Sequence, residues 1–515
     1  MILPDFHFLG VIEMINDEFK QQLYDYHDKG YLHFDFPISD NEKGQLIANL
    51  TREKVITHRF LPFISFEMKF KKYQNNPSKL TNKNRKISLP AHHDALIYKA
   101  YSLPLASAYE AYVNRKEISE IAIAYRSKKH MSNITGAKEV EDFICNQDRA
   151  WIIKGDFKHF FDNISHDVLK KSVKTVLADD YGKDWEKVLY SLINRKTIKR
   201  SDITKNLKLA GIVRPFRHGK QRAYVKNLKQ LGYLIKQGNL TPSKKENNNG
   251  IPQGTAISAI LANVSMIFFD ESIRNLVLSK HGLYRRYSDD FVIVIPGDYS
   301  LEEVKKLKNT VIEQSERNLG LEIEDSKTKL LEYVRDEKNV QEISPRVRAS
   351  TEFDYLGFSF DGKNVRLRSK GVYKFVYKGR KAINKLVTIE RDRYHIQHGT
   401  ELVVTKVLKY SRHSSKRWRD RSFAEQERYL KRIERERQDK DSSVYGTVHK
   451  QAVQMYLSME EKMPAKSMLA YAIRAQKIFD STNHPEYEVK VKQQILHQIR
   501  KNQLKLGQSR KLFKN

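Results

Sequence analysis

The sequence predicts an α+β fold followed by a helical C-terminal domain. Short apolar runs of strand length, such as residues 151–153 and 291–295, alternate with amphipathic stretches of helical period, such as residues 301–319. Near residue 400 the composition changes, and the rest of the chain is highly charged with helical periodicity. Strands mixed with helices, followed by helices alone, are typical of this fold class.

Composition and charge restrict the function. The 515 residues are 40% hydrophobic, which is enough for a sizeable core and several domains. Lys and Arg number 94 against 62 Asp and Glu, a formal net charge of +32. This surplus favours a phosphate-rich partner over a merely solvated basic surface. No apolar run is long enough to span a bilayer, which leaves only surface attachment to an anionic membrane, and we expect no membrane partner.

Cysteine usage and the N-terminus exclude other classes. Cys145 is the only cysteine, which excludes intramolecular disulfides, zinc knuckles and cysteine-ligated clusters. Its plain interpretation is a small buried hydrophobe. The first ten residues lack a basic leader and a small-residue cleavage site, so we expect a cytoplasmic protein.

The first half of the chain predicts these elements in order. Residues 85–90 predict a short strand, and residues 94–103 predict the helix after it. Residues 151–153 predict a buried strand that carries Asp156 at its tip. A helix is expected around residues 167–177.

Residues 195–245 are the most basic part of the chain. They hold fifteen Lys or Arg and a single acid, Asp202, with Phe216, Tyr224 and Tyr233 interleaved. Basic residues with aromatics suit backbone contact together with base stacking, so the stretch is interpreted as a nucleic-acid contact. The alternative is a solvated insertion loop.

In the second half, residues 255–276 predict a long apolar helix and residues 283–295 predict a β-hairpin. Residues 301–319 predict an amphipathic helix that ends at Gly320, and residues 353–360 predict a strand. Beyond residue 400, breaks at Pro464 and at residues 483–485 divide the chain into several helices whose apolar faces predict a packed domain. Those faces contain Met468, Leu469, Ala472, Ile473, Val489, Ile495, Leu496 and Ile499.

Three aspartates suggest a metal site. Asp156 follows a strand, and Asp289 and Asp290 lie at the tip of the predicted hairpin. Nucleotide addition needs two divalent ions about 4 Å apart, held by oxygen ligands on a rigid platform. Adjacent acids repel one another, a cost that a bound metal relieves. Each piece alone is commonly a turn or helix-cap residue, so their order and spacing carry the argument.

These pieces resemble the reverse transcriptase family, motif by motif and in family order. Residues 156–164 (Asp-Phe-Lys-His-Phe-Phe-Asp-Asn-Ile) resemble its first catalytic motif, and residues 287–290 (Tyr-Ser-Asp-Asp) resemble its Tyr-x-Asp-Asp signature. Residues 250–258 (Gly-Ile-Pro-Gln-Gly-Thr-Ala-Ile-Ser) are similar to the motif that grips nucleotide and template. Residues 320–328 match the next motif, and residues 353–358 (Phe-Asp-Tyr-Leu-Gly-Phe) are similar to the primer grip.

The resemblance implies roles for individual residues. It implies that Asp156, Asp289 and Asp290 are the catalytic metal ligands and that Phe157 belongs to the same metal site. Phe161 takes the place of the aromatic that screens the sugar 2′ position. The implied nucleotide-binding residues are Arg85, Arg126, Phe161, Gln253, Gly254 and Lys327, and the implied primer-grip residues are Tyr355, Leu356 and Gly357.

It also implies a domain organisation. Residues 1–150 are expected to form an N-terminal region with the fingers. Residues 151–345 are expected to form the palm, which contains the basic insertion at residues 195–245. Residues 346–400 hold the primer grip and the start of a thumb-like region, and residues 401–515 form a helical basic C-terminal domain. The fold implied is thus a right-hand polymerase of the reverse transcriptase type.

Within the family, the layout looks like the bacterial abortive-infection and "unknown group" reverse transcriptases of antiphage defence. That lineage implies dNTP substrates, a noncoding RNA template, a DNA product and a homo-oligomer. Mg²⁺ is the expected cofactor, with Mn²⁺ as the alternative, because Mg²⁺ is abundant and prefers oxygen ligands. The lineage also implies DNA synthesis that is either RNA-templated or template-independent and primed by the protein itself. Candidate priming hydroxyls are Tyr429, Tyr445, Tyr456, Tyr471 and Tyr487. Alternatives are a group II intron-type or retron-type reverse transcriptase and a nucleic-acid-binding scaffold without activity.

Overall fold

The computed structural model describes residues 17–27, 30–72, 81–126, 129, 131–244, 249–324, 328–343, 348–397, 443–460, 464–481 and 487–514. Lys327, Tyr429 and most of the charged stretch after residue 400 lie outside these ranges. Every helix of the described residues is too short or too polar to cross a membrane.

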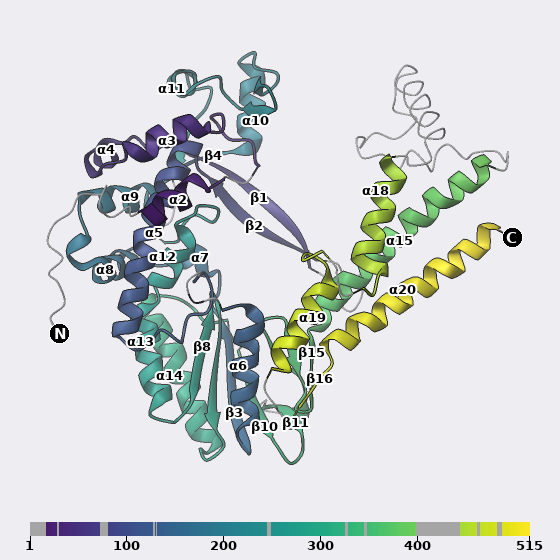
Figure 1. Cartoon of the computed structure of the whole chain (residues 1–515). Coiled ribbons are helices and arrows are strands. Elements are labelled where there is room, and N and C mark those ends of the chain that lie inside the picture. Colours follow the sequence, from purple (N-terminus) through teal and green to yellow (C-terminus); the bar gives the residue numbers. More distant parts are fainter. Residues whose placement is uncertain are drawn as a thin grey trace.

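A six-stranded antiparallel sheet forms the centre of the molecule (Figure 1). Its order is β12–β11–β10–β3–β9–β8. The strands are β3 (Arg149–Asp156), β8 (Leu283–Tyr287), β9 (Asp290–Pro296), β10 (Lys329–Val334), β11 (Asn339–Ile343) and β12 (Arg348–Ser350). The predicted buried strand and hairpin are therefore confirmed, as β3 and as β8 with β9.

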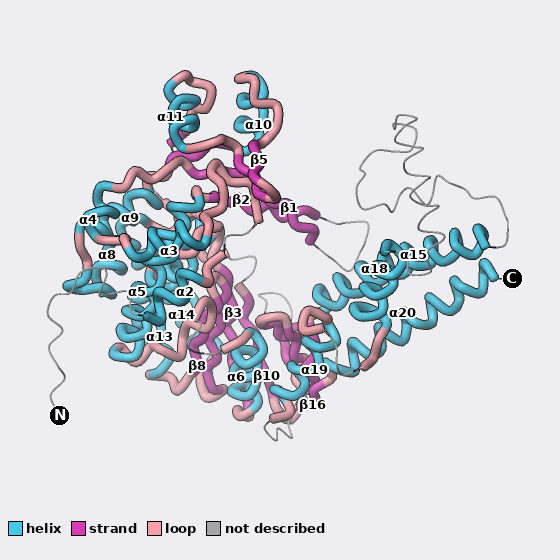
Figure 2. The backbone as a smooth tube through the Cα atoms, turned by 45° about the horizontal axis from the view of Figure 1, so that its top comes forward, coloured by secondary structure: helices cyan, strands magenta, loops and turns pink. Residues whose placement is uncertain are grey.

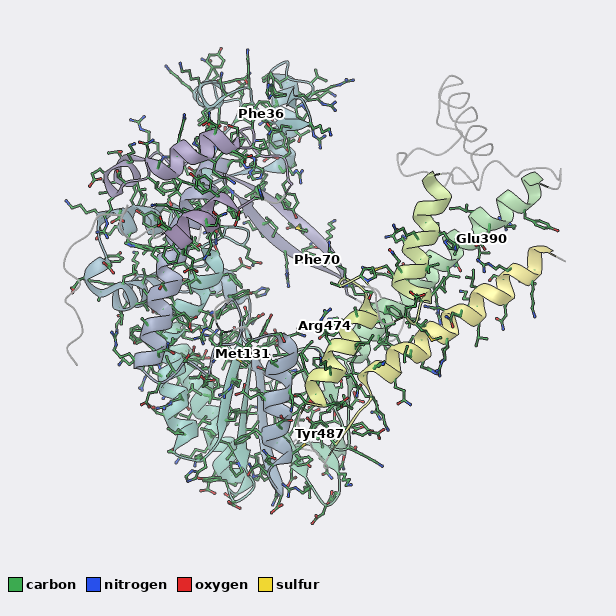
Figure 3. The ribbon with its side chains drawn as sticks, viewed as in Figure 1. Phe36, Phe70, Met131, Glu390, Arg474 and Tyr487 are labelled. Atoms are coloured by element: carbon green, nitrogen blue, oxygen red, sulfur yellow. The ribbon has the colours of Figure 1, made fainter. Side chains whose placement is uncertain are left out.

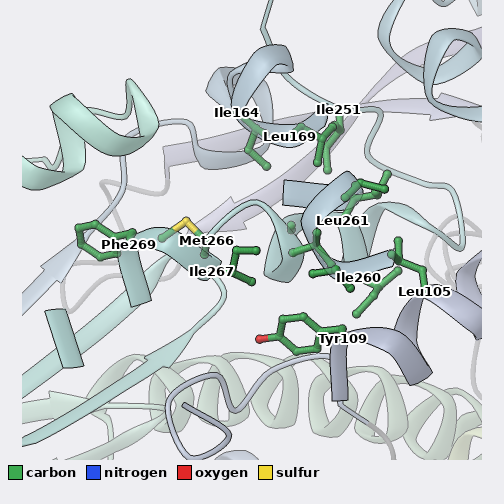
Figure 4. Packing of buried hydrophobic residues seen from close by; sticks show 14 of the residues in the cluster. Leu105, Tyr109, Ile164, Leu169, Ile251, Ile260, Leu261, Met266, Ile267 and Phe269 are labelled. Atoms are coloured by element: carbon green, nitrogen blue, oxygen red, sulfur yellow. The ribbon is translucent and has the colours of Figure 1, made fainter. Parts of the chain in front are cut away.

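Hydrophobic side chains pack against both faces of this sheet. Successive side chains of a strand point to opposite faces, so each strand contributes to both. On β3, Trp151 and Ile153 belong to one core cluster, whereas Ala150 and Ile152 belong to a second. The first cluster is completed by helices α5 (His92–Arg115), α8 (His166–Leu177), α13 (Ile267–Leu278) and α14 (Leu301–Leu319), and Figure 4 shows part of its packing. Helix α6 (Asn133–Cys145) contributes to the second cluster, and Cys145 is buried there as expected.

Two paired strands, over residues 63–72 and 81–89, form an arm beside the central sheet. Strands β1 (Phe63–Lys72) and β2 (Thr81–Leu89) make a long antiparallel hairpin, and Figure 3 shows Phe70 toward its free end. Strands β4 (Lys196–Lys199) and β7 (Ser243–Lys244) extend this sheet, in the order β2–β1–β4–β7. The short helices α2 (Asp17–Tyr24), α3 (Asp40–Ala48), α4 (Arg52–Thr57) and α9 (Lys183–Ile193) lie in the same half of the molecule (Figure 1).

The basic insertion is folded. It contains α10 (Arg200–Leu209), β5 (Phe216–His218), β6 (Gln221–Ala223) and α11 (Leu228–Lys236). Tyr224 belongs to its core and is 4% exposed, so it is not available for base stacking, whereas Tyr233 is 61% exposed. Basic side chains on its surface are Lys205, Lys208, Arg214, Arg217, Lys220, Arg222, Lys226, Lys229 and Lys236.

The C-terminal helices share a core with the central sheet. A hairpin of β13 (Phe353–Tyr355) and β14 (Phe358–Phe360) continues into β15 (Asn364–Leu367), which pairs in parallel with β16 (Glu488–Val489). Helices α15 (Ser369–Gln397), α18 (Ser443–Ala452), α19 (Met468–Phe479) and α20 (Val491–Lys514) complete the region, which projects to one side (Figure 2). Leu469, Ala472, Ile495 and Ile499 pack in the same cluster as Ile152.

One predicted helix is wrong in its extent. Instead of one helix over residues 255–276, there are two: α12 (Ser258–Val264) and α13. The Ser265 hydroxyl donates to the carbonyl of Ala262 at 2.9 Å, a local bond that competes with the helical backbone pattern. The amphipathic helix over residues 301–319 is confirmed as α14, and Gly320 ends it with a left-handed φ of 63°.

Candidate active site

Strand pairing brings the three aspartates to one end of the central sheet. Asp156, the last residue of β3, is the direct pairing partner of Asp290, the first residue of β9. Asp289 lies in the adjoining turn, and its carbonyl accepts the backbone N–H of Phe157 at 3.2 Å. Asp156 and Asp290 have the parity of Ile152 and Val292, so their side chains point to the face of the second core cluster.

A buried ion pair holds the turn between β8 and β9. Arg286 is 0% exposed and donates to both carboxylate oxygens of Asp270, at 3.0 and 2.7 Å. A further N–H of Arg286 donates to the carbonyl of Ser288 at 3.1 Å. Ser288 has a left-handed φ of 60°, a conformation that non-glycine residues adopt only when their surroundings enforce it. The Asp270 carboxylate raises the pKa of Arg286, although burial alone would lower it.

Crowding perturbs the charge of Asp290. Burial, the Asp289 charge and, less strongly, the Asp156 charge raise the pKa of Asp290 to about 6, while the ammonium of Lys154 opposes them. Lys154 lies two residues before Asp156 on β3, and its ammonium donates to the carbonyl of Asp354 in β13. Burial lowers the pKa of Lys154. One cation therefore connects the aspartates with the hairpin of β13 and β14.

The donor set fits divalent metal ions. Three carboxylates, one with a raised pKa, are oxygen donors whose mutual repulsion a cation relieves. Phe157 can add only its backbone carbonyl, because its ring is 2% exposed and packs against Phe269 and Phe291. Gly155 is required here: a Cβ would come within 2.3 Å of the Phe291 ring.

Three of the predicted nucleotide-binding residues, Phe161, Gln253 and Gly254, lie together beside β2. The backbone carbonyl of Phe161 accepts the N–H of Ile251 at 2.8 Å, and the backbone carbonyl of Gln253 accepts the N–H of Ser88 at 2.8 Å. Gly254 has a φ of 125°, and a Cβ there would lie 2.9 Å from the Ser88 carbonyl. The chain thus passes closely between helix α7 (Phe160–Asn163) and the arm.

The two arginines lie in different environments. Arg85 is exposed on β2, with its guanidinium 5.3 Å from the Phe70 ring centroid. Arg126 is 5% exposed and forms a two-point ion pair with Glu110, at 2.8 and 2.5 Å. Its remaining N–H groups donate to Ser119 and Ala122. In this conformation Arg126 holds the fold, and its neighbour Tyr125 instead reaches the site, donating to the Ser288 hydroxyl at 3.2 Å.

The predicted primer-grip residues form a tight turn beside Asp290. Tyr355 pairs with Phe358, and the two residues between them, Leu356 and Gly357, have φ of 44° and 99°. Positive φ at both central residues is typical of a type I′ hairpin turn. Tyr355 is 1% exposed, and burial together with the Asp290 charge raises the pKa of its hydroxyl.

Among the candidate priming hydroxyls, Tyr471 lies at this turn. The side-chain amide of Asn133 donates both to the carbonyl of Leu356, at 3.0 Å, and to the hydroxyl of Tyr471, at 2.7 Å. Tyr487 is 7% exposed and donates to Asp142 at 2.6 Å, and Tyr456 packs against Phe375. Tyr445 lies in α18, and nothing of its side chain is described.

Sequence reasoning missed the residues that support the site. Lys154 and Arg286 contact other segments of the chain, so no local pattern marks them. Asp270 carries a partial signal, because it follows the apolar residues Phe268 and Phe269 in a helical stretch, where a buried charge requires a partner.

The fold and the site define a right-hand polymerase, with fingers, a palm that carries the aspartates and a helical region in the thumb position. A family model described as reverse transcriptase (RNA-dependent DNA polymerase) matches residues 71–360. The chain belongs to this family. Reverse transcriptases act on nucleic acid and use divalent metal ions.

Similar proteins cover the chain in part. Protein YkfC of Escherichia coli (strain K12) is 21% identical over 283 residues, which are 49% of this chain and 61% of that protein. The chain thus spans less than two thirds of that relative. Apo telomerase from Candida tropicalis, truncated from its C-terminal domain, has a TM-score of 0.36 at 12% identity, covering 64% of this chain and 60% of its own. Telomerase from Candida albicans, in complex with a TWJ fragment of telomeric RNA, has 0.38 at 11% identity, covering 88% and 63%.

Replacing Arg286 with Met should destabilise the protein, because Asp270 would become a buried carboxylate without its cation. We expect the free energy of unfolding in urea to fall by about 3–5 kcal/mol. The control is Arg274→Met, since Arg274 pairs with the 76% exposed Glu117, and an exposed pair contributes less than about 1 kcal/mol. Equal losses in both variants would contradict the role given to Arg286.

Asp290→Asn should stabilise the metal-free protein. Because the folded-state pKa of Asp290 is raised to about 6, the native state binds this proton more tightly than the unfolded chain, and stability falls as pH rises through that value. In EDTA at about pH 8, above that pKa, the variant should therefore melt at a higher temperature than wild type, a gap that closes toward about pH 4. Mg²⁺ should raise the melting temperature of wild type only.

The matched control for this measurement is Asp148→Asn, since the Asp148 side chain is 94% exposed. Its melting temperature should follow wild type at every pH. A variant at position 290 that melts below wild type at pH 8 in EDTA would show that the clustered charges cost the fold nothing.

Proposed function

We propose that this protein is a DNA polymerase that adds deoxynucleotides by a two-metal mechanism, directed by RNA or independent of an added template. The observation that carries this proposal is the pairing of Asp156 with Asp290 across β3 and β9, with Asp289 in the adjoining turn. Carboxylates on a rigid sheet edge suit Mg²⁺, or Mn²⁺ as the alternative, because both are oxygen-preferring ions.

The residues around the aspartates divide the work. Asp156, Asp289, Asp290 and the Phe157 carbonyl would hold the ions, which when bound activate the attacking hydroxyl and neutralise the triphosphate. Phe161 would stand against the sugar and favour dNTPs, while Gln253 and Gly254 would line the nucleotide pocket. Tyr355, Leu356 and Gly357 would position the primer end. Lys154 and Arg286 act as positioning residues, because each contacts the backbone that carries or faces the aspartates.

The folded basic insertion supports a stably bound nucleic acid. Its surface carries lysines and arginines over two short helices and a hairpin, with the exposed Tyr233 among them. Neutralising many phosphates releases counterions and gives tight, salt-sensitive binding. We infer that this partner is a noncoding RNA that serves as template.

For the biological role we propose antiphage defence of the abortive-infection type, with priming by the protein itself and assembly as a homo-oligomer. Tyr471 supports protein priming among the described candidates, since its hydroxyl shares Asn133 with the turn at Leu356. A group II intron-type or retron-type enzyme in mobility would instead need an added primer. An inactive nucleic-acid-binding scaffold would not depend on Asp289.

The direct test is synthesis by the purified protein with Mg²⁺ and labelled dNTPs, with neither primer nor template added. We expect labelled DNA whose mobility on a denaturing gel changes after protease treatment, and whose synthesis is lost after ribonuclease pretreatment. Asp289→Ala should abolish it. Synthesis only with an added primer–template would favour the intron or retron alternative. No synthesis under either condition would refute the polymerase assignment.

Tyr471→Phe separates priming from polymerisation, because it removes one hydroxyl and keeps the ring. We expect loss of the protein-linked product, with extension of an added primer–template retained. Tyr456→Phe is the matched control, since the ring of Tyr456 packs against Phe375. Equal protein-linked synthesis by the Tyr471 variant and wild type would rule this hydroxyl out.

A further inference from the structure

Two histidines and an aspartate are buried together in the fingers, away from the three aspartates of the palm. His33 is 0% exposed, and Asp35 and His92 are each 8% exposed. One potential ligand atom from each of the three lies within 4.8 Å of the others. The two imidazole rings are stacked, with centroids 3.8 Å apart.

A backbone carbonyl fixes the tautomer of His33. Its Nδ1 lies 2.8 Å from the carbonyl oxygen of Pro90. Because a carbonyl oxygen only accepts, Nδ1 must carry the proton, and the Nε2 lone pair of the neutral ring is directed elsewhere. A histidine whose second nitrogen donates to a backbone carbonyl is the arrangement that orients metal-binding imidazoles in proteins.

Asp35 adds a buried negative charge to the cluster. Its carboxylate accepts the backbone N–H of His92 at 3.1 and 2.9 Å, at the start of α5. It forms no ion pair with any lysine or arginine of the described residues. Asp94, two residues further along α5, is 1% exposed, and its carboxylate contacts the imidazole of His58 at 2.7 Å. The charge of Asp35 thus lies in a buried environment, where a bound cation would offset it.

We propose that His33, Asp35 and His92 bind one structural Zn²⁺ or a similar first-row divalent ion. Two imidazole nitrogens and one carboxylate oxygen suit this class of metal, whereas Mg²⁺ and Ca²⁺ prefer oxygen ligands throughout. Ligands about 2.0–2.2 Å from zinc lie roughly 3.5 Å apart, so small side-chain movements would close the site. Three protein ligands leave one position for water.

The site joins three segments that are distant in sequence. The backbone of His33 bridges to Ala223, and its carbonyl accepts the N–H of Tyr224 at 3.0 Å. The ring of Phe36, labelled at the base of the insertion in Figure 3, lies 6.4 Å from that of His218. A metal here would tie the N-terminal segment to α5 and, through it, fix the orientation of the basic insertion.

The test is metal analysis of the full-length protein without an affinity tag, prepared with zinc in the medium and desalted. We expect about one zinc per chain. His33→Gln and His92→Gln should lose it, and Asp35→Asn should weaken binding while keeping an acceptor for the N–H of His92. His93→Gln is the matched control, because His93 neighbours His92 but contacts the exposed Glu42. Asp289→Ala should retain zinc, which separates this site from the palm.

Two further measurements decide the case if a glutamine variant misfolds. Zinc-selective chelation should lower the melting temperature of wild type, since a ligand of the native state stabilises it, and it should not affect Asp35→Asn to the same degree. Cobalt added to the stripped protein should give the visible bands of a tetrahedral site. Wild type without zinc and without those bands, or equal zinc in wild type and all three site variants, would overturn the proposal and leave a hydrogen-bonded cluster.

Discussion

The register between β3 and β9 is the constraint on which the rest of the site depends. It sets Asp156 opposite Asp290 at the point where both strands end. Carboxylates on directly paired residues repel each other when both are ionised. Alternating apolar side chains fix the register, since a slip of one residue would exchange the two core clusters. The buried Arg286 stabilises the turn by donating to the carbonyl of Ser288. Packing and ion pairing therefore offset the repulsion between the neighbouring aspartates.

The sequence predicted the parts that local pattern determines. Asp156, Asp289 and Asp290 were found because each follows or precedes a strand of clear periodicity, and the roles of these side chains remain predictions that the assays test. Arg126 illustrates what pattern cannot reveal. Its role in nucleotide binding stays a prediction, whereas its pairing with Glu110, sixteen residues earlier in the chain, is a contact that no local pattern indicates.

Other features of the fold were not predicted, for different reasons. The long apolar helix predicted over residues 255–276 is two helices because one serine hydroxyl bonds to its own preceding turn. His33 and His92 carried no signal, because a pair of histidines some sixty residues apart has no recognisable spacing, and only the meeting of the N-terminal segment with α5 makes them neighbours. Tyr224 was grouped with base-stacking aromatics because sequence does not reveal which side of a small insertion is its core.

The parallel pairing of β15 with β16 has a consequence for the synthesis of the chain. Asn364 and Val365 of β15 pair with Glu488 and Val489 of β16. The side-chain amide of Gln494 accepts the backbone N–H of Leu367 and donates to its carbonyl. The ribosome must therefore synthesise more than a hundred further residues before the hairpin of β13 and β14 beside Asp290 can make all its contacts. Until then the apolar face around Phe358 and Phe360 is unprotected, which makes nascent chains clients for chaperones. Partial translation products would lack a finished palm.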